Sequence, residues 1–214
     1  MSIKESHGIG LFRCLACVVL FSSMVFLPFA VKAEKPGASE TIRTFNAALI
    51  EAMKRADELG YSGRYKLLEP VITDSFAFSF MASQALGRYW KPLTSEEQAL
   101  FLKIYTDWSI ATYAGRFDGY SGERFELVSE SPPDRGTITV VSRLVEPNNE
   151  EVGFHYKLRR LEGKWRIVDI QISGVSQLAL TRSQFVNVMK DKGLKGLVSM
   201  LNDKIEGFSK EKNR

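Results

Sequence analysis

The spacing of hydrophobic residues changes near Gly122, from a helical period of about 3.6 residues before it to a strand period of about 2 after it. The spacing changes back within Trp165–Phe185. The first part of this segment alternates as a strand, Ser173-Gly174 predicts a turn, and helical spacing begins near Ser176. A strand that passes so directly into a helix requires the helix to fold back on the sheet to which the strand belongs.

The first half of the chain predicts a series of amphipathic helices. Ser39 is placed to cap a first helix that ends before Gly60, with its apolar residues on one side. A break over residues 61–63 follows. Pro70 predicts the start of a second helix, because proline fits the first turn of a helix but not its interior. A short third helix ends at Gly87.

A long helix follows, and its start is the clearest local signal in the sequence. Thr94 and Glu97 have the spacing of a capping box, and helical spacing continues to about Phe117. Large aromatic residues, including Tyr105 and Trp108, recur along its apolar side. Aromatic residues in this arrangement are more often part of a core than the wall of a binding site, and the residues alone leave both interpretations open.

Four runs with alternating hydrophobicity predict strands: Arg124–Val128, Thr137–Val145, Val152–Leu161 and Trp165–Ile172. The short connections between them make the strands antiparallel neighbours. Two helices, about Ser176–Lys190 and Leu194–Ile205, follow with Gly193 between them. The predicted fold class is therefore α+β: a curved four-stranded antiparallel sheet with a helical layer on its apolar face, similar to the NTF2-type cone with an apolar cavity.

The N-terminal segment predicts a secretory signal peptide over residues 1–33. Lys4 and Arg13 precede an apolar run, Cys14–Val31, and the small residue Ala33 suits a cleavage site. The alternative is an uncleaved membrane anchor, since the run is nearly long enough to span a bilayer. Cleavage would remove both cysteines of the chain.

We expect residues 34–209 to form a single domain and residues 210–214 to be a disordered tail. Cleavage would remove three cations and one anion, which lowers the formal charge of the chain from +4 to +2. A near balance of this kind does not indicate a partner nucleic acid.

Few residues are suited to catalysis or metal binding. The segment after the signal peptide holds one histidine, His155, and no cysteine, so we expect no metal site and no cofactor. Asp169 interrupts an apolar strand, and in a cone-shaped fold it would be a candidate general base. The competing interpretation is that Asp169 faces solvent or pairs with Arg166 or Arg182.

An ordered set of residues resembles the periplasmic toluene-tolerance family, whose best-known branch is the soluble phospholipid carrier of the Mla system for outer-membrane lipid asymmetry. The residues that carry the resemblance are Leu86–Trp90, Thr94–Phe101, Tyr113–Gly122, Tyr156–Arg160, Gly163–Trp165, Asp169, Gly174–Ser176, Arg182, Phe185, Gly193–Leu194 and Leu197. Residues 176–183 are more similar to the hopanoid-associated branch, so the resemblance implies either a phospholipid or a hopanoid as cargo.

The resemblance implies a periplasmic lipid-binding shuttle, not an enzyme, that works between the outer and inner membranes. Its implied partners are an outer-membrane lipoprotein complex and an inner-membrane ABC transporter with a substrate-binding ring. The alternative function is an NTF2-like enzyme that acts on an apolar substrate through Asp169. For a shuttle, we expect the lipid cavity to be lined by Tyr105, Trp108, Tyr113, Val140, Leu144, Phe154, Tyr156, Val175 and Leu178.

Overall fold

A computed structural model describes residues 37–211 of the chain. The expected signal peptide and the last three residues of the expected tail lie outside the described residues. The helices are α1 (Ala38–Lys54), α2 (Ala56–Ser75), α3 (Phe78–Leu86), the 3-10 turn η1 (Gly87–Tyr89), α4 (Ser95–Arg116) and α5 (Gln177–Glu211). The strands are β1 (Arg124–Glu130), β2 (Thr137–Val145), β3 (Glu151–Leu161), β4 (Lys164–Ile172) and β5 (Val175–Ser176).

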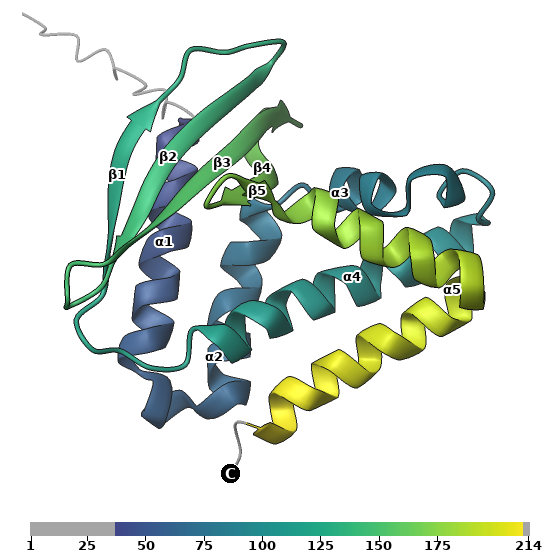
Figure 1. Ribbon diagram of the computed structural model, residues 1–214, viewed down its shortest axis with the longest axis horizontal. Helices are drawn as coiled ribbons and strands as arrows, with labels where there is room; N and C mark the ends of the chain where they lie inside the picture. Colours follow the sequence, from purple (N-terminus) through teal and green to yellow (C-terminus); the bar gives the residue numbers. More distant parts are fainter. Residues whose placement is uncertain (1–36, 212–214) are drawn as a thin grey trace, which may run out of the picture. The chain divides into compact units, whose positions relative to one another are not determined.

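The predicted α+β class is confirmed. Within residues 37–211 the strands form one antiparallel sheet in the order β1-β2-β3-β4-β5. The apolar face that the sequence predicts is the buried one, since Ile138, Val140, Tyr156 and Leu158 are all at most 5% exposed. The helices cover this face, and α1 runs along the sheet behind β1 and β2 (Figure 1).

The strand β5 is an addition to the four predicted strands. Ser173 and Gly174 both have a positive φ, at 50° and 82°, which gives the tight two-residue turn of a hairpin. The turn pairs Val175 with Ile172 and Ser176 with Gln171 before α5 begins. A strand of two residues is too short to show a periodic pattern, which explains why the sequence does not predict it.

The helices form two groups according to what they pack against. The helix α1 lies on the sheet, whereas α4 packs mainly against α2, α3 and α5. The aromatic side of α4 therefore packs mainly against other helices. None of the helices in residues 37–211 is long and apolar enough to span a membrane.

The prediction that Ser39 caps α1 is wrong. The helix begins two residues earlier than predicted, with Gly37 as its N-cap. The backbone N–H of Ser39 donates to a carboxylate oxygen of Glu130 at 3.0 Å, and the hydroxyl of Ser39 donates to the same oxygen. A carboxylate from the end of β1 thus satisfies a free N–H group at the start of α1, where negative charge is also favoured by the helix dipole.

The prediction that Pro70 starts a helix is also wrong. Pro70 lies inside α2, and the break in the helix is at Gly60, with φ 57° and ψ −174°. Pro70 and Lys66, whose carbonyl loses its helical hydrogen bond, both lie on the exposed side of α2. Water can reach this carbonyl, while the buried residues Leu68 and Ile72 hold the helix on the core.

The helix α5 consists of two arms that meet at Gly193 (Figure 1), as the sequence predicts. Gly193 has φ 63° and ψ −170°, a conformation that is essentially restricted to glycine. The second arm continues to Glu211, and Lys210, the first residue of the expected disordered tail, pairs with Glu206 at 2.8 Å.

We expect Gly193→Ala to lower the free energy of unfolding by about 1–3 kcal/mol, because alanine is strained in this conformation. The measurement is urea unfolding followed by circular dichroism. Gly207→Ala is the control, since Gly207 lies in the same helix with open space at its Cβ position. This variant should gain about 0.5–1 kcal/mol from helix propensity. Equal effects of the two substitutions would contradict the assigned hinge.

Candidate functional site

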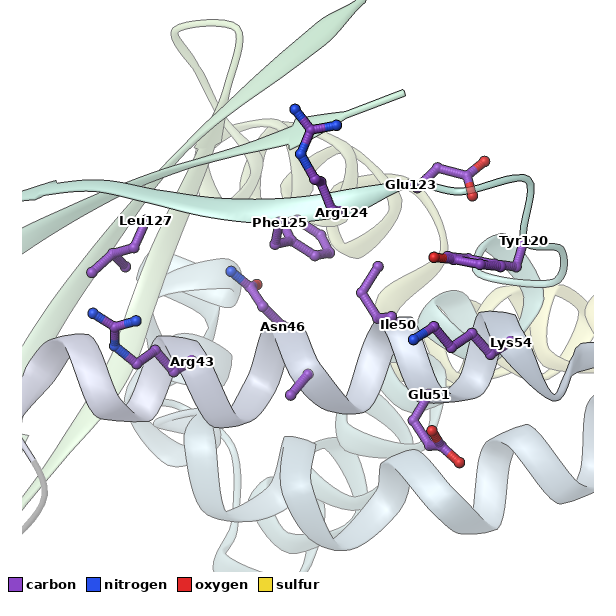
Figure 2. Close-up of a pocket in the computed structure, with 11 residues that line it drawn as sticks. Arg43, Asn46, Ile50, Glu51, Lys54, Tyr120, Glu123, Arg124, Phe125 and Leu127 are labelled. Atoms are coloured by element: carbon purple, nitrogen blue, oxygen red, sulfur yellow. The ribbon is translucent and has the colours of Figure 1, made fainter. Parts of the chain in front are cut away.

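A cavity of about 430 Å³ lies between α1 and β1. This volume falls within the range of roughly 300–1,000 Å³ that is common for small-molecule sites. Figure 2 shows Asn46 and Ile50 of the helix facing Phe125 and Leu127 of the strand across the gap, whereas Glu51 and Arg124 point away from it. The cavity is lined by Arg43, Asn46, Ala47, Ile50, Glu51, Lys54, Tyr120, Glu123, Arg124, Phe125 and Leu127.

The inner walls of the cavity are apolar and its rim is charged. Phe125 and Leu127 point from β1 toward α1, and Ile50 points back from the helix (Figure 2). Between the two strand residues, Glu126 pairs with Arg143 at 2.7 Å. Strand alternation therefore separates an apolar wall from a charged outer face.

The helix α1 is attached to the β1 segment at both ends of the cavity. At one end Ser39 donates to Glu130. At the other end the ammonium group of Lys54 lies 5.4 Å from the centre of the Tyr120 ring, a cation–π contact. Both contacts are exposed. They fix the two ends of the gap and leave its middle open between helix and strand.

A hydrogen-bonded group of buried side chains joins α1 to the sheet at the inner side of the cavity. The hydroxyl of Tyr156 donates to Oδ1 of Asn46 at 3.0 Å, and Nδ2 of Asn46 donates to the hydroxyl of Ser142 at 3.1 Å. All three residues are at most 6% exposed. Burial raises the pKa of Tyr156 well above its usual value, so its hydroxyl stays a neutral donor.

A second hollow lies beside Pro70 on the exposed side of α2. Its other lining residues are Lys66, Glu69, Thr73, Asp74 and Arg166, all charged or polar. The two basic side chains of β4 near it have structural partners, since Lys164 pairs with Asp74 at 2.5 Å and Arg166 donates to the last carbonyls of α2. This hollow lacks the apolar walls that a hydrocarbon needs.

The nine residues predicted to line a lipid cavity lie in three different environments. Tyr105, Val140 and Tyr156 are buried in the core. Val175 on β5 is 48% exposed. The partly buried residues are Trp108, Tyr113, Leu144, Phe154 and Leu178.

Leu144, Phe154 and Tyr156 lie next to the lining of the α1–β1 cavity, and none of the nine belongs to the lining itself. Leu144 pairs with Phe125 across β1 and β2. The ring of Phe154 is 5.7 Å from the ring of Phe125, and Tyr156 holds Asn46.

Ring contacts occupy the space beneath the aromatic side of α4. The ring of Tyr113 lies 5.3 Å from that of Phe45 on α1 and 5.8 Å from that of Phe76. Tyr105 packs on Phe101 and on Phe185 in the same way. The rings of α4 thus pack on aromatic side chains of α1, of α5 and of the end of α2.

The sequence feature that corresponds to the α1–β1 cavity is a second, narrower line of residues along one side of α1. Arg43, Ala47, Ile50 and Lys54 follow at spacings of three to four residues, beside the buried side of the helix. Only Ile50 in this line is strongly apolar. The line is therefore weak compared with the core residues of α1, and the periodicity of the sequence does not distinguish it from an ordinary solvent-exposed side of the helix.

Asp169 has a structural partner that explains its position. Its Oδ1 accepts a hydrogen bond from the backbone N–H of Leu178 at 3.1 Å, in the first turn of α5. Ser176 accepts from the N–H of Ala179 at the same helix end. Asp169 therefore caps the helix that follows its strand, a role that differs from both the predicted surface position and an ion pair with Arg166 or Arg182. Within residues 37–211 no group of three or more possible metal ligands is found.

We expect the stability of the protein to fall as the pH rises above about 10, the ordinary pKa of tyrosine. Burial raises the pKa values of Tyr105 and Tyr113 as well as that of Tyr156, and burial with a nearby Asp107 raises the pKa of Tyr65 to about 12. Because the folded state holds these protons more tightly than the unfolded chain does, the stabilisation is complete below pH 10 and is lost above it.

The measurement is the free energy of unfolding as a function of pH, together with phenolate absorbance. Tyr105→Phe should make the alkaline decline shallower, because it removes one of the buried hydroxyl groups whose pKa is raised. Ionisation of all tyrosines near pH 10 in the folded protein would contradict this account.

Comparisons with known proteins agree with this architecture. The profile of the MlaC protein family matches residues 43–203. The intermembrane phospholipid transport system binding protein MlaC of Haemophilus influenzae is 24% identical over 126 residues, and the match covers 57% of this chain and 59% of that relative's length.

A solved structure has the same fold. It is a phospholipid-binding protein from Ralstonia solanacearum in complex with a phospholipid, with a TM-score of 0.71 and 22% identity, and the match covers 81% of this chain and 99% of that one. Because the family profile extends over most of the sequence, from α1 into the second arm of α5, the chain belongs to the MlaC protein family.

Proposed function

We propose that this protein binds a phospholipid, with a hydrocarbon chain in the cavity between α1 and β1, and carries it through the periplasm between the outer and inner membranes. The observation that carries the proposal is the cavity itself, with apolar walls from Ile50, Phe125 and Leu127 and a charged rim. Family membership, the Haemophilus influenzae relative and the lipid in the Ralstonia solanacearum structure support it.

The hydrophobic effect is large enough to hold a lipid in such a site. Each methylene group taken out of water contributes about 0.8 kcal/mol, so two chains of roughly 15 carbons correspond to about 25 kcal/mol. The ordering of the lipid and of the site offsets much of this free energy. A lipid held in this way leaves slowly into water, which favours transfer by direct handover at each membrane.

A phospholipid with two acyl chains requires more room than a single chain, and β1 can provide it. Among residues 37–211, this strand is at the edge of the sheet and pairs only with β2. Its register shifts at Val128, which marks a bulge. Outward movement of β1 would widen the cavity toward Phe154. Phe154 and Tyr156, two of the predicted lining residues, would then form the deeper wall that a second chain reaches.

We also propose that the carrier works with one partner at each membrane. The resemblance to the toluene-tolerance family supports an outer-membrane lipoprotein complex as one partner and an inner-membrane ABC transporter with a substrate-binding ring as the other. It also supports a hopanoid as an alternative cargo, through residues 176–183.

Asp169 requires no catalytic role in this proposal. Its hydrogen bond to the N–H of Leu178 accounts for a carboxylate in an otherwise apolar strand. We therefore propose a lipid-carrier function in preference to that of an NTF2-like enzyme.

We expect Ala47→Phe to reduce the amount of co-purified phospholipid by about tenfold, because the added ring would occupy space that the lipid chain needs. The measurement is native mass spectrometry of protein isolated gently from the periplasm. Ala99→Phe is the matched control, since Ala99 is exposed on α4 away from the cavity. Absence of lipid from the unmodified protein, or equal lipid in both variants, would contradict the proposal.

A further inference from the structure

Asn46 is a buried amide in a cavity whose other inner residues are apolar. It lies on α1, is 6% exposed and still belongs to the lining of the cavity. Its carboxamide points from the helix toward β1, beside Phe125 and Leu127 (Figure 2). Burial of an amide is unfavourable unless its hydrogen-bonding groups are satisfied, so its partners are informative.

The hydrogen bonds of Asn46 leave one donor free. A carboxamide has two N–H donors and one carbonyl acceptor. In the described part of the chain, Oδ1 accepts from Tyr156 and Nδ2 makes a single hydrogen bond, to Ser142. One N–H of Nδ2 is left without a partner. The result does not depend on which amide atom is the oxygen. If the two atoms are exchanged, Ser142 donates to the oxygen, Tyr156 accepts from the nitrogen, and one N–H is again left without a partner.

We propose that Asn46 recognises a hydrogen-bond acceptor on the bound lipid, namely the ester carbonyl that joins an acyl chain to its glycerol. This inference rests on the proposed function. An ester carbonyl is the one polar acceptor that enters an apolar cavity attached directly to a hydrocarbon chain. Asn46 therefore selects ester-linked glycerolipids over ligands that bring only hydrocarbon into the cavity.

The order of residues along α1 fits the order of groups in such a lipid. Arg43 lies three residues before Asn46, nearly one helical turn away, and is an exposed cation at the rim. Ile50 lies about one turn beyond Asn46 on the apolar wall. A phosphate near Arg43 places the ester carbonyl beside Asn46 and the acyl chain along Ile50 and Phe125.

Tyr156 and Ser142 act as positioning residues in this arrangement. They hold the amide from two different strands, β3 and β2, so the free N–H has a fixed direction. A site built to make a hydrogen bond discriminates against a ligand that lacks the acceptor, because the buried donor then stays unpaired.

The test uses two phosphatidylcholines with the same head group and the same number of chain carbons, one with ester and one with ether linkages. Delipidated protein is mixed with vesicles that contain both lipids, and the bound lipids are compared by native mass spectrometry. We expect the unmodified protein to take up the ester lipid about tenfold more than the ether lipid. Asn46→Leu should lose this preference, and Tyr156→Phe should reduce it.

Asn187→Leu is the matched control, since Asn187 is exposed on α5 and its replacement should leave the preference intact. Equal uptake of both lipids by the unmodified protein would overturn the role of Asn46 and leave the carrier function standing. Uptake of neither lipid would overturn the carrier function, and with it this inference. If Asn46→Leu does not fold, the ratio for the unmodified protein and the effect of Tyr156→Phe still decide the question.

Discussion

The structure depends on how α1 is held on the sheet. On the buried side of α1, Phe45 lies between the helical layer and the sheet. Its ring makes edge contacts with the rings of Tyr113 and Tyr156, at centroid distances of 5.3 Å and 6.1 Å. Asn46 adds the buried hydrogen bonds to β2 and β3. These contacts fix the distance of α1 from the central strands. The β1 segment is also joined to the two ends of α1, through Ser39 and Lys54.

The aromatic residues of α4 acquire their role from this arrangement. They pack on α1, α3 and α5, so their bulk keeps α1 in place and does not directly form the walls of the α1–β1 cavity. Of the two walls of the cavity, the edge strand β1 is the one that we propose moves, while α1 stays packed on the core. Such a division suits a carrier, because the site must both exclude water and release its cargo.

The sequence predicts the elements better than it predicts the site. The capping box of Thr94 and Glu97 is confirmed in both of its hydrogen bonds, and Gly193 breaks α5 as expected. These signals are local, so the sequence contains them completely. The carboxylate of Glu130 caps the start of α1 by accepting from Ser39, which is 91 positions away in the sequence. No local pattern can indicate this contact. The cavity likewise arises from two weak apolar lines, one on α1 and one on β1, that become adjacent only in the fold.

The most direct test of the central claim is a crystal structure of the complex with a phospholipid that carries bromine atoms in its acyl chains. Anomalous scattering then locates the hydrocarbon without reference to the protein contacts. We expect bromine from at least one chain between α1 and β1, in contact with Ile50, Phe125 or Leu127. Bromine found elsewhere in the molecule, with none in this cavity, would contradict the account.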